Sequence, residues 1–182
     1  MKKSEIMKEI LVGLAAVGAV VLIAAAVPSL PIALAGVYKP LRRYKDHQIR
    51  RGFAYLKQKK MIGIGQEKGK TIIKLTEAGK SRLVKFQLND LRIKLPKKWD
   101  GKWRMVIFDI PERFKVARQA LSAKLRELKF ELLQKSVWIC PYSCQDEIDF
   151  IVAVYEVDPF VRLFTIDSSQ LEKYWQKKFN LI

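Results

Sequence analysis

An apolar segment that ends in an acidic residue and a proline constrains the fold of this chain most. Residues 104–109 read Arg-Met-Val-Ile-Phe-Asp, and Ile110, Pro111 and Glu112 follow directly. Proline lacks a backbone N–H and suits the first turn of a helix, so a helix is expected to begin near Pro111. The sequence therefore predicts a strand followed by a helix, with the Asp109 carboxylate at the C-terminal end of the strand.

The segments that follow continue this alternation of strand and helix. Hydrophobic periodicity predicts a strand at 104–109, a helix at 112–128, strands at 131–136 and 137–141, a helix at 144–156 and a strand at 161–166. This order is βαββαβ, the ferredoxin-like pattern, and a last helix is expected over about 169–179. One side of the first helix carries the apolar residues that are expected to pack on the sheet: Ala117, Leu121, Leu125 and Leu128.

Three short motifs in this half carry a family resemblance. They are the leader Trp99-Asp100-Gly101-Lys102-Trp103, the segment Phe108-Asp109-Ile110-Pro111 and the segment Gln134-Lys135-Ser136-Val137. Together they resemble the small CRISPR-associated endonuclease of the spacer-integration complex, the Cas-two protein. They resemble more closely the Cas-two-like central domain of PaaX-type transcriptional repressors. The resemblance implies a DNA-binding transcriptional regulator that forms a homodimer through this domain.

Asp109 is the candidate catalytic residue, and two interpretations of it remain open. In the resembled endonuclease the equivalent aspartate of each protomer meets its twin and holds a divalent metal, which here implies Asp109 as a Mg²⁺ ligand. The alternative function is then a metal-dependent endonuclease or spacer-adaptation factor. A carboxylate before Pro111 can instead cap the following helix. We favour the cap, a chain that is not an enzyme, and no cofactor.

The charge of the chain is concentrated in its first half. Residues 1–98 contain 22 Lys and Arg against 6 Asp and Glu, whereas residues 99–182 contain 13 against 12. The net charges are therefore +16 and +1, out of +17 for the chain. A segment this basic attracts a polyanion, which is either nucleic acid or an anionic membrane surface.

The order of elements after residue 39 is typical of a winged helix-turn-helix. Residues 39–60 hold nine basic residues and one acid, with apolar positions on one helical stripe, and two β-rich runs at 61–65 and 71–75 then indicate a hairpin, the wing. A helix that begins after Thr76, a plausible N-cap, completes the pattern. A basic helical hairpin that contacts protein or membrane is the alternative. The expected contacts to double-stranded DNA are Arg42, Arg43, Lys45, Arg50, Arg51, Lys57, Lys68 and Lys70.

An uncharged run from Ile10 to Tyr38 has three interpretations. Residues 10–27 meet the roughly 18-residue length of a membrane-spanning helix, which would anchor a cytoplasmic body to the inner membrane. Ala24, Ala25 and Ala26 could mimic a signal-peptide cleavage site. The interpretation we favour is a packed first helix over 10–27, with a second short helix at about 30–38, in a cytoplasmic protein.

The domain organisation expected from these features is α+β. A basic winged-helix domain spans 1–95, the interrupted stretch 91–98 is a linker, and a ferredoxin-like domain spans 99–182. Cys140 and Cys144 are the only cysteines, so a disulfide framework is not expected. A zinc site is not expected either, because His47 is the single histidine and lies far away in the sequence.

Overall fold

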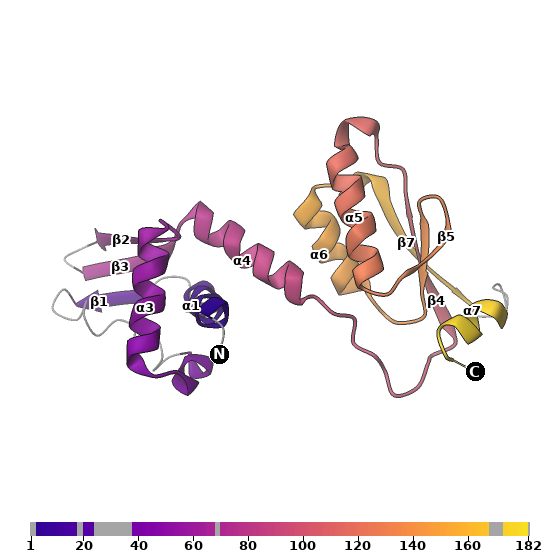
Figure 1. Cartoon of the computed structure of the whole chain (residues 1–182). Helices are drawn as coiled ribbons and strands as arrows, with labels where there is room; N and C mark the ends of the chain where they lie inside the picture. Colours follow the sequence, from indigo (N-terminus) through magenta and orange to yellow (C-terminus); the bar gives the residue numbers. More distant parts are fainter. Residues whose placement is uncertain (1–2, 18–19, 24–37, 68–69, 168–172, 182) are drawn as a thin grey trace. The chain divides into compact units, whose positions relative to one another are not determined.

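The chain folds as two compact units, Met1–Asn89 and Asp90–Ile182. The computed structural model describes residues 3–17, 20–23, 38–67, 70–167 and 173–181 (Figure 1). Each unit has its own sheet and its own apolar core.

The first unit combines helices with a three-stranded antiparallel sheet. Its elements are the helix α1 (Lys3–Val17), the strand β1 (Val20–Ile23), the 3₁₀ helix η2 (Lys39–Arg43), the helix α3 (Asp46–Gln58), the strands β2 (Ile62–Glu67) and β3 (Lys70–Leu75), and the helix α4 (Glu77–Asp90). The strand order is β1-β3-β2. The core joins α1, η2, α3, the sheet and α4, and its fully buried side chains are Ile10, Leu11, Leu14, Leu41, Ile49, Leu56 and Ile73.

The expected first helix over residues 10–27 is wrong in its extent. The helix α1 ends at Val17, and residues 20–23 pair as a strand with β3, from Val20 opposite Ile73 to Ile23 opposite Lys70. The physical reason is the run Val-Val-Leu-Ile, whose β-branched side chains favour a pleated strand over a helix. Across the described ranges, no helix has the length and apolar character that crossing a membrane requires. The short helix expected at 30–38 lies almost wholly outside the described residues.

The basic stretch forms two helical pieces where one stripe was expected. The 3₁₀ helix η2 ends at Arg43, Tyr44 is extended, and α3 begins at Asp46. The backbone N–H of Lys45 donates to the Gln48 side chain at 3.0 Å, which satisfies one N–H at the start of α3. The apolar stripe itself is confirmed, because Leu41, Tyr44, Ile49, Phe53 and Leu56 are all buried.

The hairpin and the cap that follow it are confirmed. The strands β2 and β3 pair from Ile62 opposite Leu75 to Glu67 opposite Lys70. The Thr76 hydroxyl accepts the Gly79 N–H at 3.1 Å, as an N-cap does, and donates to the Lys60 carbonyl at 2.6 Å. Thr76 thereby joins the end of α3 to the start of α4.

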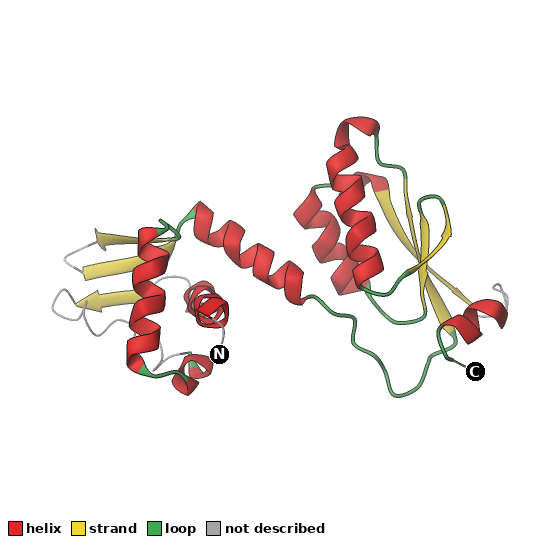
Figure 2. Cartoon of the chain, in the orientation of Figure 1, coloured by secondary structure: helices red, strands yellow, loops and turns green. Residues whose placement is uncertain are grey.

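The second unit is a four-stranded antiparallel sheet with two helices on one face (Figure 2). Its elements are β4 (Lys102–Phe108), η3 (Glu112–Phe114), α5 (Lys115–Glu127), β5 (Glu131–Gln134), β6 (Val137–Cys140), α6 (Gln145–Tyr155), η4 (Asp158–Phe160), β7 (Val161–Asp167) and α7 (Lys173–Lys178). The strand order β5-β6-β4-β7 and the βαββαβ succession are those of the expected ferredoxin-like pattern. Leu121, Leu125 and Leu128 of the first helix are buried, as its spacing predicts.

The Trp-Asp-Gly-Lys-Trp leader builds a turn in front of β4. Asp100 accepts the Lys102 N–H at 3.1 Å and two hydrogen bonds from the Arg104 guanidinium, at 2.8 and 2.6 Å. Gly101 has a φ of +75°, which glycine adopts without strain. Trp103 is fully buried, and its ring meets that of Trp99 edge to face at 5.4 Å between centroids. This motif is therefore structural.

The irregular stretch from Leu91 to Gly101 belongs to the second unit. The Arg92 guanidinium lies 3.5 Å from the Glu127 carboxylate at the end of α5. The second unit, Asp90–Ile182, thus includes the stretch 91–98 that was expected to be a linker.

Candidate nucleic-acid interface

The exposed side of α3 is basic and polar. Ile49, Gly52, Phe53 and Leu56 face the core, and the opposite side of the helix carries the residues exposed to solvent. Asp46 at the start of α3 is exposed too, and we call the remaining exposed residues the α3 strip: His47, Arg50, Arg51, Ala54, Lys57 and Gln58. Three cations, two hydrogen-bonding side chains and a small central Ala54 can approach a surface that displays phosphates and base edges.

Close packing behind the strip holds α3 against α1. A Cβ on Gly52 would lie 2.7 Å from Cδ1 of Ile10 and 3.1 Å from Cγ2 of Ile6, so glycine is needed for this approach. A groove of about 750 Å³ runs beside the strip and is lined by Ile6 from α1 and by Gln48, Arg51, Gly52, Ala54, Tyr55 and Gln58 from α3.

The structure separates the predicted contacts Arg42 and Arg43 from the helix that carries the others. Both lie on η2 and are exposed, but Arg43 donates to Glu9 of α1 at 2.8 Å. The Tyr38 hydroxyl donates to the other Glu9 oxygen at 3.0 Å, and burial together with this hydrogen bond raises the Tyr38 pKa. Glu9 therefore ties η2 to α1, and Arg43 has a structural role that its sequence position did not indicate.

The remaining predicted contacts divide into two groups. Lys45 is exposed just before α3, and Arg50, Arg51 and Lys57 are exposed along this helix. Lys68 lies outside the described residues. Lys70 begins β3 at the wing, and its backbone alone is described.

Sequence reasoning missed three members of the strip. His47 was weighed only as a metal ligand, and neither Ala54 nor Gln58 was considered. The signal that could have found them is helical spacing, because positions 47, 50, 51, 54 and 58 share one face of a helix that begins at 46. The expectation of a longer helix that includes residues 41–44 obscured this spacing.

Asp109 does not cap the helix that follows it. The residue before η3 is Pro111 and the residue before α5 is Phe114, and neither helix end has a side-chain cap hydrogen bond. Proline at 111 has an extended ψ of 153°, which delays the helix by several residues beyond the carboxylate. Asp109 is instead exposed just beyond β4, and its backbone N–H donates to the Phe160 carbonyl at 3.0 Å.

Glu112, the first residue of η3, forms ion pairs with cations of α5. Glu112 accepts from Arg118 at 2.7 Å and lies 3.4 Å from Lys115. These cations, Arg118 first, lower the Glu112 pKa. In the described ranges, no group of three His, Cys, Asp or Glu side chains is placed to hold a metal ion.

Comparison with known proteins identifies the second unit. Residues 96–177 match the family model described as the PaaX protein central Cas2-like domain. The search of curated proteins finds no match to the chain. The matched region covers the whole four-stranded sheet and all three motifs that carried the resemblance. Over residues 96–177 the second unit is therefore similar to the PaaX central Cas2-like domain.

Proposed function

We propose that this chain is a DNA-binding transcriptional regulator of PaaX type, with a winged helix as its first unit. The observation that carries the proposal is the α3 strip, a basic exposed helix face in a half of the chain with net charge +16. The order α1-β1-η2-α3-β2-β3, with β1 added to the β2–β3 hairpin, supports the winged helix. In this proposal α3 enters the major groove and the hairpin contacts the neighbouring backbone.

Binding to duplex DNA should depend steeply on salt. If the strip and its neighbours neutralise roughly 5–8 phosphates, the log–log slope of affinity against salt is about −5 to −7. Arg50→Ala with Arg51→Ala removes two of those contacts, so affinity should fall and the slope should flatten by about 2. Fluorescence anisotropy with labelled duplex at several salt concentrations measures both quantities.

The matched control for this pair lies within the near-neutral residues 99–182. Arg113→Ala with Lys115→Ala also removes two exposed cations, and it should leave the slope unchanged. A full-length protein that does not bind duplex at about 50 mM salt would contradict the proposal, as would equal losses in the two double variants.

We also propose that the second unit forms a homodimer through the open face of its sheet. Directly opposed residues share a face, so Met105 and its partner Phe164 lie on the side away from α5 and α6, together with Ile107. Phe164 is 49% exposed, and Met105 and Ile107 are half-buried. These neighbouring apolar side chains, in a region (residues 99–182) of net charge +1, favour self-association.

Phe164→Glu tests this surface. A charge at the centre of a buried apolar interface is costly, so the variant should be monomeric by light scattering at concentrations where the wild type is a dimer. Val116→Glu, at an 81% exposed position on α5, is the control and should remain a dimer. A wild-type protein that is monomeric at high micromolar concentration would contradict the proposed dimer.

Comparing the wild type with Asp109→Asn distinguishes the nuclease interpretation from the regulator. It requires Asp109 to bind Mg²⁺ with its twin in the dimer, whereas the regulator needs no metal there. DNA or RNA cleavage by the purified wild type in Mg²⁺, lost in Asp109→Asn, would support the nuclease and contradict the regulator.

A further inference from the structure

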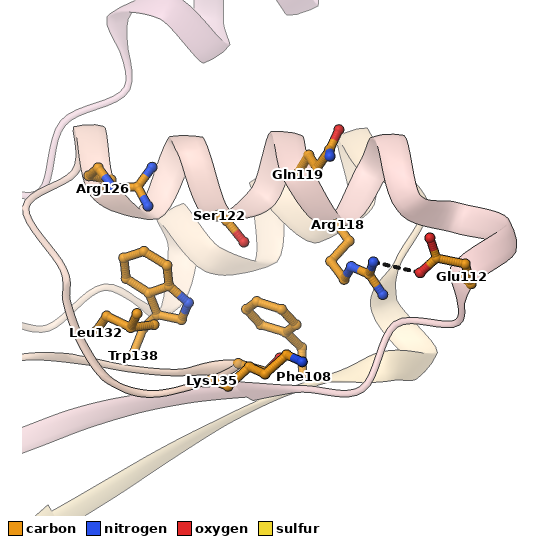
Figure 3. A pocket seen from close by; sticks show the side chains of 10 residues that line it. Phe108, Glu112, Arg118, Gln119, Ser122, Arg126, Leu132, Lys135 and Trp138 are labelled. Carbon is orange, nitrogen blue, oxygen red and sulfur yellow. Dashed lines mark hydrogen bonds and ion pairs between the residues drawn. The ribbon is translucent and has the colours of Figure 1, made fainter.

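A pocket of about 650 Å³ lies between α5 and the β5–β6 hairpin, far in sequence from the α3 strip (Figure 3). Its size falls within the range of sites that hold small organic ligands. Phe108, Leu132 and Trp138 give it apolar walls, and Ser122 points into it from α5.

Trp138 supplies an unused hydrogen-bond donor at the floor of this pocket. The side chain is only 3% exposed, and its Nε1 has no hydrogen-bond partner among the described residues. In Figure 3 the indole nitrogen is directed toward the space between Ser122 and Phe108. A buried N–H without a partner carries a free-energy cost, which an acceptor atom bound here would remove.

Three cations surround the pocket. The Arg126 guanidinium stands over the Trp138 ring at 5.5 Å from its centroid, and Lys135 borders the opposite side. Arg118 is held in place by Glu112 at 2.7 Å and by the Ile110 carbonyl at 3.2 Å. With Glu112 counted, the rim carries a net charge of +2, whereas residues 99–182 together carry only +1.

We infer that this pocket binds a small organic anion, a molecule with one carboxylate, sulfonate or phosphate group on an apolar body. The Trp138 N–H would donate to the anionic group, Arg126 and Lys135 would attract it from the two sides of the pocket, and the apolar body would lie against Phe108 and Leu132. A small molecule is favoured over nucleic acid because the positive charge is local to a concave site, whereas residues 99–182 as a whole are nearly neutral. The inference is independent of DNA binding by the first unit.

Anilinonaphthalene sulfonate is a suitable probe because it joins an apolar ring system to one sulfonate. The full-length protein should bind it saturably, with one site per chain, as a rise in probe fluorescence. Arg126→Gln with Lys135→Gln should weaken binding by about tenfold or more, since hydrogen bonds to charged groups are the strong ones. The uncharged analogue N-phenylnaphthylamine should bind the wild type and this variant equally weakly.

The NMR signal of the Trp138 indole provides a second readout, which nonspecific binding of the probe to an apolar surface elsewhere would not change. In an amide and indole proton–nitrogen NMR spectrum, the Trp138 signal, assigned by its loss in Trp138→Phe, should shift on titration with the probe. The Trp99 signal should stay in place, because its Nε1 already donates to the Lys102 carbonyl at 3.0 Å. The control Arg113→Gln, on η3 outside the pocket, should bind as the wild type does.

Several outcomes would overturn the inference. One is probe binding that does not saturate or that survives in Arg126→Gln with Lys135→Gln. Another is a Trp138 signal that does not move at saturation. Displacement of the probe by duplex DNA, with the same dependence on Arg126 and Lys135, would assign the surface to nucleic acid instead.

Discussion

Asp100 shows how a single residue of a sequence motif acquires a structural function. Its carboxylate binds the Arg104 guanidinium through both oxygens, and these hydrogen bonds lower the Asp100 pKa from its ordinary value of 3.8. Arg104 is mostly buried, with 11% of its side chain exposed, so the pair anchors the leader turn to β4. The motif was predictable from the sequence, whereas its role was not, because the bonds depend on the φ of +75° at Gly101.

Asp100→Asn should therefore lower stability in a pH-dependent way. A carboxyl whose pKa is lower in the folded state adds stability above its unfolded pKa and loses it as the pH falls through the folded pKa. The melting temperature of the variant should lie below that of the wild type at pH 7, and the two should converge as the pH falls below about 4. Melting curves from pH 7 to pH 3 measure the gap, and a gap that stays constant over this range would contradict the assigned role.

At the scale of elements, hydrophobic periodicity predicted which residues are buried more accurately than it predicted where helices and strands begin and end. The stripe from Leu41 to Leu56 is buried as expected, although the chain breaks between η2 and α3. The apolar run from Ile10 was ambiguous, because helix and strand both bury such residues and hydropathy does not distinguish them. The pairing of β1 with β3 decides it, and that partner lies about 50 residues away in the sequence.

Leu14→Ala tests the packing of α1 in the first unit. Leu14 is 1% exposed, so truncation leaves a cavity and should cost about 2–5 kcal/mol in the free energy of unfolding. Ala16→Ser, at an exposed position two residues further on, should change it by less than about 0.5 kcal/mol. Far-ultraviolet circular dichroism during urea denaturation measures both, and a small effect of Leu14→Ala would mean that α1 does not form the core described.

At the scale of the whole molecule, the two units differ in their charge and in their tryptophan content. The basic excess lies in the first 98 residues, whereas all four tryptophans, Trp99, Trp103, Trp138 and Trp175, lie in the second unit. Tryptophan fluorescence therefore reports on the second unit alone, and circular dichroism reports on both. Separate cores predict that each unit unfolds in its own transition.

Duplex DNA should stabilise one of these transitions and leave the other in place. A ligand that binds only the folded first unit raises its melting temperature by mass action, so the circular-dichroism transition without a tryptophan signal should move upward with DNA concentration. Leu14→Ala should lower that same transition without moving the tryptophan transition. Asp100→Asn should lower the tryptophan transition and leave the transition of the first unit unchanged. A dimer formed by the second unit adds a concentration dependence to the tryptophan transition only. If DNA instead raises the tryptophan transition, nucleic acid binds the Cas2-like unit and the assignment of DNA binding to α3 is wrong.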